Sequence, residues 1–126
     1  MKNPIVKIVL AGLWITLSEF LRNEILFKNY WVNHFNSLGL VFQTTPVNGI
    51  GWLIWSFILA FNIYRLLLRL CFWEVFGLTW LMAFVMMWIT CFNLQVLPVS
   101  LLLLAVPLSM LEVAVAELII QEHRPN

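Results

Sequence analysis

The chain has 126 residues, of which 63% are hydrophobic and only 10% are charged. A soluble domain carries about 25% charged residues, so this composition excludes an ordinary soluble domain and predicts one integral membrane domain over residues 1–126, with the lipid bilayer as its main partner. The net charge of +1 gives no strong field, so nucleic acid is not an expected partner.

The first predicted span covers residues 5–27. Asn3 is a good N-cap, and Pro4 fits the first helical position because its missing N–H would be unpaired there in any case. Lys2 and Lys7 before an apolar stretch resemble the start of a signal peptide, but no small-residue cleavage site follows. We therefore expect this segment to be a retained transmembrane helix.

An amphipathic helix is predicted at residues 28–39. Its polar residues are interrupted by apolar ones at helical spacing, namely Phe27, Trp31, Phe35 and Leu38. Gly39 follows the last apolar residue, as expected of a helix-ending glycine. If this helix continued the first span, it would be about 52 Å long against about 30 Å of hydrocarbon, so we expect a bend and an interfacial position.

Polar and turn-forming residues from Thr44 to Gly49 predict a loop, after which the second span covers residues 50–68. A short connection leads to the third span, residues 74–92.

No charged residue lies between Glu74 and Glu112, and a straight helix over that stretch would measure about 55 Å. The chain must therefore turn, and Asn93 to Pro98 carries the turn signal. The fourth span covers residues 97–120, where the internal Pro107 predicts a kink. The fold class is an all-α, four-transmembrane-helix bundle with an interfacial helix between spans one and two.

Four spans place both termini on one side of the membrane. The cations expected on that side are Lys2, Lys7, Arg65, Arg69 and Arg124, against Arg22 and Lys28 on the other. Because cytoplasmic segments carry the excess of Lys and Arg, this bias predicts a multi-pass protein of the cell's inner membrane with cytoplasmic termini.

Glu19 is the first candidate site residue, since a carboxylate inside a span is costly unless it is paired, protonated or hydrated. Arg22 lies one helical turn further on and Asn23 lies at i+4, so a local polar network is expected. Two interpretations stay open: a proton- or cation-binding carboxylate in a cavity, or an ion pair that fixes helix packing.

Glu112, in the fourth span, is the second candidate. The cytoplasmic ends of spans two to four also bring charged residues to one level of the membrane, which predicts an inner charge cluster of Arg65, Arg69, Glu74 and Glu117. This cluster has two interpretations as well: a structural salt-bridge network, or an inner gate or proton relay. Asn62 is expected to make an interhelical hydrogen bond.

The sequence contains no catalytic, phosphate-binding or dinucleotide-binding motif, so we expect no enzyme activity and no cofactor. His34 and His123 lie on separate segments, and no metal site is expected. Cys71 and Cys91 lie about 30 Å apart along one predicted helix, so no disulfide within the chain is expected.

The residues from Leu13-Trp14 to Phe27-Lys28 and Trp31 give the chain a resemblance to small bacterial four-span integral membrane proteins of an uncharacterised family. That resemblance implies a fold and no activity. The chain is also similar in architecture to the small multidrug exporters, which are four-span dimers with a Glu in the first span, as Glu19 is here. It lacks their glycine-rich packing pattern, and its first loop is longer.

Two function classes lead. The chain is expected to be a small transporter, or proton- or cation-coupled carrier, that uses its membrane-embedded carboxylates, and a homodimer would most easily enclose a transport path. The alternative is a non-catalytic interaction or assembly subunit. The sequence identifies no ligand.

Overall fold

The computed structural model describes residues 3–41 and 46–122, which form helices and no strand. Lys2, Thr44, Thr45, His123 and Arg124, which the sequence predictions used, lie outside the described residues. The elements are α1 (Pro4–Phe20), η1 (Leu21–Leu26), α2 (Lys28–Ser37), α3 (Pro46–Leu67), α4 (Phe72–Trp80), η2 (Leu81–Val85), α5 (Met86–Asn93), η3 (Val99–Leu101) and α6 (Leu102–Glu122). Both η1 and η2 are π-helical, whereas η3 is a 3₁₀ turn.

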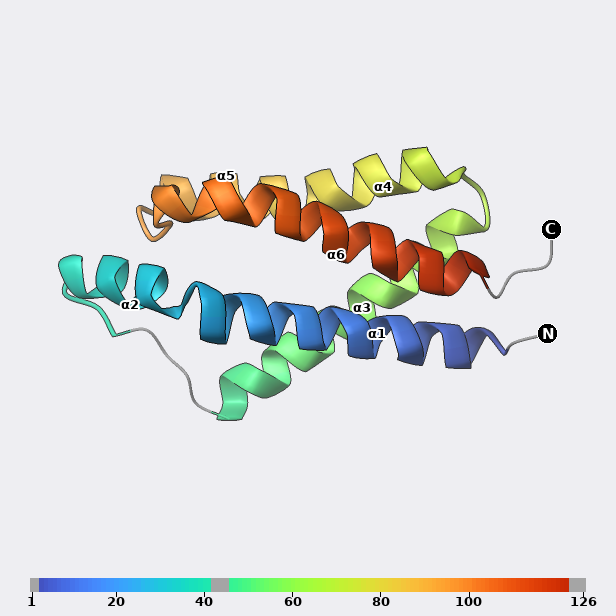
Figure 1. Cartoon of the computed structure of the whole chain (residues 1–126), viewed down its shortest axis with the longest axis horizontal. Helices are drawn as coiled ribbons and strands as arrows, with labels where there is room; N and C mark the ends of the chain where they lie inside the picture. The colour runs from blue at the N-terminus through green and yellow to red at the C-terminus, as the bar shows by residue number, and fades with distance from the viewer. Residues whose placement is uncertain (1–2, 42–45, 123–126) are drawn as a thin grey trace.

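Four helical stretches are long and apolar enough to cross a membrane, namely Pro4–Leu26, Val47–Leu67, Phe72–Asn93 and Val99–Gln121. Their bounds lie within three residues of those predicted for the four spans. The all-α four-helix bundle is therefore confirmed, and it is compatible with a multi-pass membrane protein. Both termini lie at the same end of the bundle, and α3 crosses the other helices obliquely (Figure 1).

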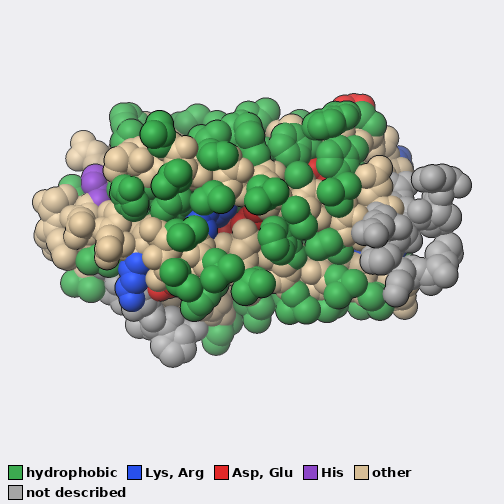
Figure 2. Space-filling view, in the orientation of Figure 1, with side chains coloured by type: hydrophobic (Ala, Val, Ile, Leu, Met, Phe, Trp, Pro, Cys, Tyr) green, Lys and Arg blue, Asp and Glu red, His purple; other side chains and the backbone are tan. Residues whose placement is uncertain are grey.

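The outer surface of the bundle is apolar. Figure 2 shows hydrophobic side chains over most of the face formed by α1 and α6, and Leu103 is 86% exposed. Such a surface is unfavourable in water and suits a hydrocarbon surrounding.

Two predicted helix boundaries are confirmed by their hydrogen bonds. The Asn3 side chain caps α1 by accepting a hydrogen bond from the Ile5 N–H at 2.8 Å, with Pro4 at the first helical position. Gly39 ends α2 with φ of 74°. The N–H groups of Gly39 and Leu40 donate to carbonyls of the last turn of α2, the double closure typical of a helix-ending glycine.

The most extensive contact between two helices joins α1 to α3. A Cβ atom added to Gly12 would lie 2.7 Å from the ring of Phe57, so only a glycine allows this approach. Ala11 and Ile15 of α1 pack beside Ala60 and Ile63 of α3 in one of two core clusters. The other cluster contains aromatic residues of η2 and α5 and the start of α6. Small residues at a helix contact let the two backbones approach, as is common in membranes.

α2 continues beyond the end of η1 in nearly the direction of α1, rather than folding back along the bundle (Figure 1). The change of path occurs at Phe27, whose φ and ψ of −108° and 6° are not helical. His34 Nε2 lies 2.9 Å from the carbonyl oxygen of Gln95, in the turn between α5 and η3. The polar helix is thus attached to the turn that the sequence predicted at Asn93 to Pro98.

α6 remains one helix from Leu102 to Glu122 although Pro107 lies inside it. Proline has no N–H, so the carbonyl of Leu103 loses its helical donor. The loss falls within two turns of the start of the helix and does not end it.

Candidate functional site

A buried arginine between two buried glutamates forms the centre of the candidate site. Arg22 Nη2 lies 2.6 Å from Glu19 Oε1, and Arg22 Nη1 lies 3.4 Å from Glu112 Oε1. The arginine is 6% exposed, and the two glutamates are 3% and 0% exposed. These are the two ion pairs within the described residues.

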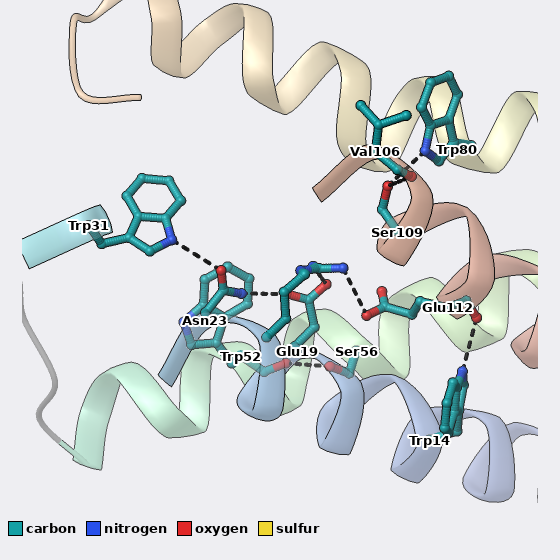
Figure 3. A network of polar contacts seen from close by, with 11 residues as sticks. Trp14, Glu19, Asn23, Trp31, Trp52, Ser56, Trp80, Val106, Ser109 and Glu112 are labelled. Carbon is teal, nitrogen blue, oxygen red and sulfur yellow. Dashed lines mark hydrogen bonds and ion pairs between the residues drawn. The ribbon is translucent and has the colours of Figure 1, made fainter. Parts of the chain in front are cut away.

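The structure brings together the four residues of the predicted intramembrane polar site, Glu19, Arg22, Asn23 and Glu112. Asn23 Nδ2 donates a hydrogen bond of 2.9 Å to Glu19 Oε2, so both oxygens of this carboxylate are bonded. Figure 3 shows Asn23 directed toward Glu19, with Glu112 of α6 on the other side of Glu19.

Glu19 and Glu112 lie at different depths in their spans, but one arginine side chain reaches both carboxylates. Glu19 lies seven residues from the end of its span at Leu26, and Glu112 lies nine residues from the opposite end of its own at Gln121. On straight antiparallel helices their Cα atoms would differ in depth by about 9 Å. The long Arg22 side chain bridges that interval and contacts both carboxylates.

Two π-helical segments position the arginine. Arg22 lies in η1, and its guanidinium carbon lies 5.0 Å from the centre of the Phe84 ring in η2. A π-helical turn contains an extra residue that rotates the side chains after it, and such turns are frequent at functional sites. The arginine is therefore held by two carboxylates and one aromatic face.

Aromatic side chains surround this group. The Trp14 indole N–H donates to the main-chain carbonyl of Glu112 at 2.9 Å, and the Trp31 indole N–H donates to Asn23 Oδ1 at 3.2 Å (Figure 3). Trp55 and Trp88 lie against the Phe84 ring, with ring centroids 6.1 and 6.0 Å away. The indole contacts connect α1 to α6 and α2 to η1, so the site is linked to the packing of four elements.

Glu112 is less completely bonded than Glu19. Its Oε2 atom is buried and has no hydrogen-bond partner among the described residues. The residue lines a cavity of about 180 Å³ together with Trp14, Ser18, Arg22 and Leu111. In Figure 2, positively and negatively charged atoms are visible between hydrophobic side chains in the middle of the face formed by α1 and α6.

The formal charges of the site do not balance. Glu19 and Glu112 carry two negative charges when ionised, and Arg22 supplies one positive charge. An uncompensated charge in a hydrocarbon interior is costly. One proton or one monovalent cation would neutralise the group, so the arrangement is suited to binding and releasing a single positive charge.

The predicted inner charge cluster does not form ion pairs in the described part of the chain. Glu117 is fully buried, and neither of its carboxylate oxygens has a hydrogen-bond partner. Arg65 and Arg69 are exposed, and Glu74 accepts a hydrogen bond of 3.2 Å from the Cys71 thiol. The residues lie near one end of the bundle, but Glu117 is on the buried side of α6 whereas both arginines face outward.

Sequence reasoning missed Phe84, Trp14 and Trp31 as parts of the site. The first span offered a signal only for Trp14, which precedes Glu19 on the same helix. Nothing in the sequence marks Phe84 among ten phenylalanines, because its role depends on the π-helical turns.

Cys71 and Cys91 are free cysteines, as expected. Within residues 3–41 and 46–122, no group of three or more His, Cys, Asp or Glu side chains is arranged to hold a metal ion.

In the comparisons with known proteins, no family model, no curated protein and no solved structure matches this chain.

Proposed function

We propose that this protein is a small proton-coupled membrane carrier in which Glu112 takes up and releases the proton. The observation that carries the proposal is the buried, unpartnered Oε2 atom of Glu112 beside an arginine that is already bound to Glu19. A proton on this carboxyl neutralises the site, and a transported cation that displaces the proton keeps it neutral.

The two glutamates have different roles in this proposal. Glu19 is bonded through both oxygens, to Arg22 and to Asn23, and acts as the fixed counter-ion of the arginine. Glu112 has one long contact of 3.4 Å to the same arginine, so its protonation disturbs few other interactions.

Glu117 offers a second position for the proton on its way to one membrane surface. It lies on α6 five residues beyond Glu112, about 7.5 Å along the helix toward the end that holds both termini. Its carboxyl is buried inside the bundle, and ionisable groups at such positions in membrane proteins mark proton pathways.

We also propose that the protein lies in the inner cell membrane with cytoplasmic termini. Lys7 and Arg22 lie within the first span and Arg65 lies within the second. The cations outside the spans are then Lys2, Arg69 and Arg124 for the end with the termini against Lys28 for the other end, so the cation bias toward the termini is kept. Two copies facing each other through α1 and α6 would enclose the site, which a single chain leaves as a cavity of about 180 Å³.

Infrared spectroscopy of the protein in lipid tests proton uptake directly, since a protonated carboxyl has its own C=O stretching band. We expect a pH-dependent band in the wild type that is reduced in Glu112→Gln and in Glu117→Gln and is absent in the double variant. Glu74→Gln removes an exposed carboxyl at the end of the bundle and should leave the buried band unchanged.

The alternative function, a non-catalytic assembly subunit, is favoured by the bonded set of Glu19, Arg22, Asn23 and Trp31, which would also fix helix packing. If the wild type shows no pH-dependent carboxyl band, or if the band survives in the double variant, the carrier proposal fails. The structural interpretation then becomes the better one.

A further inference from the structure

A second cavity lies between α3 and the α4–η2 helix, apart from the carboxylate site. Its volume is about 470 Å³, which lies in the range of small-molecule pockets. Its polar lining consists of Asn62 and Arg65 from α3 and Thr79 from α4, and much of the rest is apolar.

The three polar side chains have no partners within the described residues. Thr79 is 2% exposed, and its hydroxyl makes no hydrogen bond. Asn62, which the sequence predicted to bond another helix, makes no such bond to a described residue, and Arg65 forms no ion pair there. Unbonded polar groups cost free energy in hydrocarbon, so an occupant that supplies acceptors would stabilise this groove.

The lining changes in character with depth. Arg65 lies two residues before the end of α3, Asn62 lies about 4.5 Å deeper along the same helix, and Thr79 lies about 10 Å from the start of α4. Trp55, Ile58 and Met82 form the apolar wall beyond them. From the bundle end inward, the groove presents a cation, then two hydrogen-bond donors, then an apolar surface.

We propose that this groove binds one glycerophospholipid. The phosphodiester accepts charge-assisted hydrogen bonds from the Arg65 guanidinium. The ester carbonyls, which follow the phosphate in the lipid, accept from the Asn62 amide and from the Thr79 hydroxyl, which is buried in the lipid-free structure and turns toward the groove by rotation of its side chain. One acyl chain lies along Trp55, Ile58 and Met82. Phosphate, ester carbonyls and acyl chain follow one another in the lipid in the same order as the cation, the hydrogen-bond donors and the apolar wall of the groove.

A second copy of the chain fits this groove less well. A symmetric pair would place the same groove on both copies, so each Arg65 would need an acceptor from its partner. The lining contains no Asp or Glu. The proposal does not depend on the carrier function, since neither Glu19, Arg22 nor Glu112 lines this groove.

Native mass spectrometry of the full chain in mild detergent tests the proposal, with titration of phosphatidylglycerol and of a diacylglycerol with the same acyl chains. We expect the wild type to bind one phosphatidylglycerol and to bind diacylglycerol about tenfold more weakly. Arg65→Gln should weaken phosphatidylglycerol binding about tenfold, the effect of losing one hydrogen bond to a charged group.

Arg69→Gln is the matched control, because it removes the same charge from the same end of the bundle but does not line the groove. It should change the affinity less than about threefold. Thr79→Val keeps the shape of the side chain and removes a hydroxyl that has no protein partner. It should weaken lipid binding several-fold without lowering the thermal stability of the lipid-free protein.

Equal losses in Arg65→Gln and Arg69→Gln would mean diffuse attraction of headgroups to the bundle end, and the site would not exist. Equal binding of diacylglycerol and phosphatidylglycerol would show that the phosphate contributes nothing to the affinity, which contradicts the proposal. A dimer that binds no lipid and dissociates in Arg65→Gln would assign the groove to a second copy instead.

Discussion

Replacing Glu19 with glutamine should destabilise the protein strongly, whereas the same replacement at Glu112 should not. Glu19 makes the 2.6 Å contact to Arg22 and also accepts from Asn23, so Glu19→Gln leaves the arginine with a single carboxylate at 3.4 Å. Removing one partner of a buried ion pair costs about 3–5 kcal/mol when the remaining charge is uncompensated, and the 3.4 Å contact to Glu112 compensates Arg22 only in part. Glu112→Gln removes the excess negative charge and leaves the shorter pair in place, so the free energy of unfolding should change by less than about 1 kcal/mol or increase.

The assay is equilibrium unfolding in mixed lipid and detergent micelles, followed by loss of helical circular dichroism. The double variant Glu19→Gln, Glu112→Gln should be no more stable than Glu19→Gln, because the buried arginine then has no carboxylate. If Glu112→Gln costs as much as Glu19→Gln, the two carboxylates share Arg22 equally. The distinction between a fixed counter-ion and a proton-binding group would then be wrong.

Three further predictions follow from backbone and packing. Gly12→Ala should destabilise the protein by about 1–3 kcal/mol in the same unfolding assay, because the new Cβ would lie 2.7 Å from the Phe57 ring. Gly77→Ala is the control, since a Cβ there has no neighbour within 4 Å, and it should be neutral or stabilising by up to about 1 kcal/mol. Gln95→Gly should raise the free energy of unfolding by about 1 kcal/mol, since Gln95 has a φ of 61° that glycine adopts without strain. A loss of stability would show that the Gln95 side chain makes a compensating contact. Alkylation of the denatured, unreduced protein should modify both cysteines, and a mass corresponding to an unmodified pair would reveal a disulfide.

The sequence was sufficient for the helices because each span is limited by a simple physical length. Capping and turn-forming residues at Asn3, Gly39 and Asn93–Pro98 predicted the ends of helices, and the thickness of hydrocarbon limited what lay between them. The continuation of α2 in the direction of α1 was not predicted. It depends on the change of path at Phe27 and on the contact of His34 with Gln95, and neither follows from periodicity.

The site was predictable only in its local part. Glu19, Arg22 and Asn23 lie three and four residues apart, and that spacing alone predicts contact on a helix. The contact with Glu112 depends on how α1 and α6 are staggered and on the reach of one arginine side chain. Arg65 and Glu117 were expected to lie in one charge cluster because both are near the same end of the bundle. Similar depth in the membrane does not determine which face of each helix carries the residue, so the sequence could not show that the two side chains point apart.

The extra residue in η1 also sets the rotational phase of everything that follows it. If Leu21–Leu26 formed a regular α-helix with the same residues, each later side chain would turn by about 100° about the helix axis. Trp31 would then no longer face Asn23, and His34 would turn away from the carbonyl of Gln95. The π-helical turn therefore decides which face α2 presents to the rest of the protein, and a chain one residue shorter in this segment would present the same face through a regular α-helix.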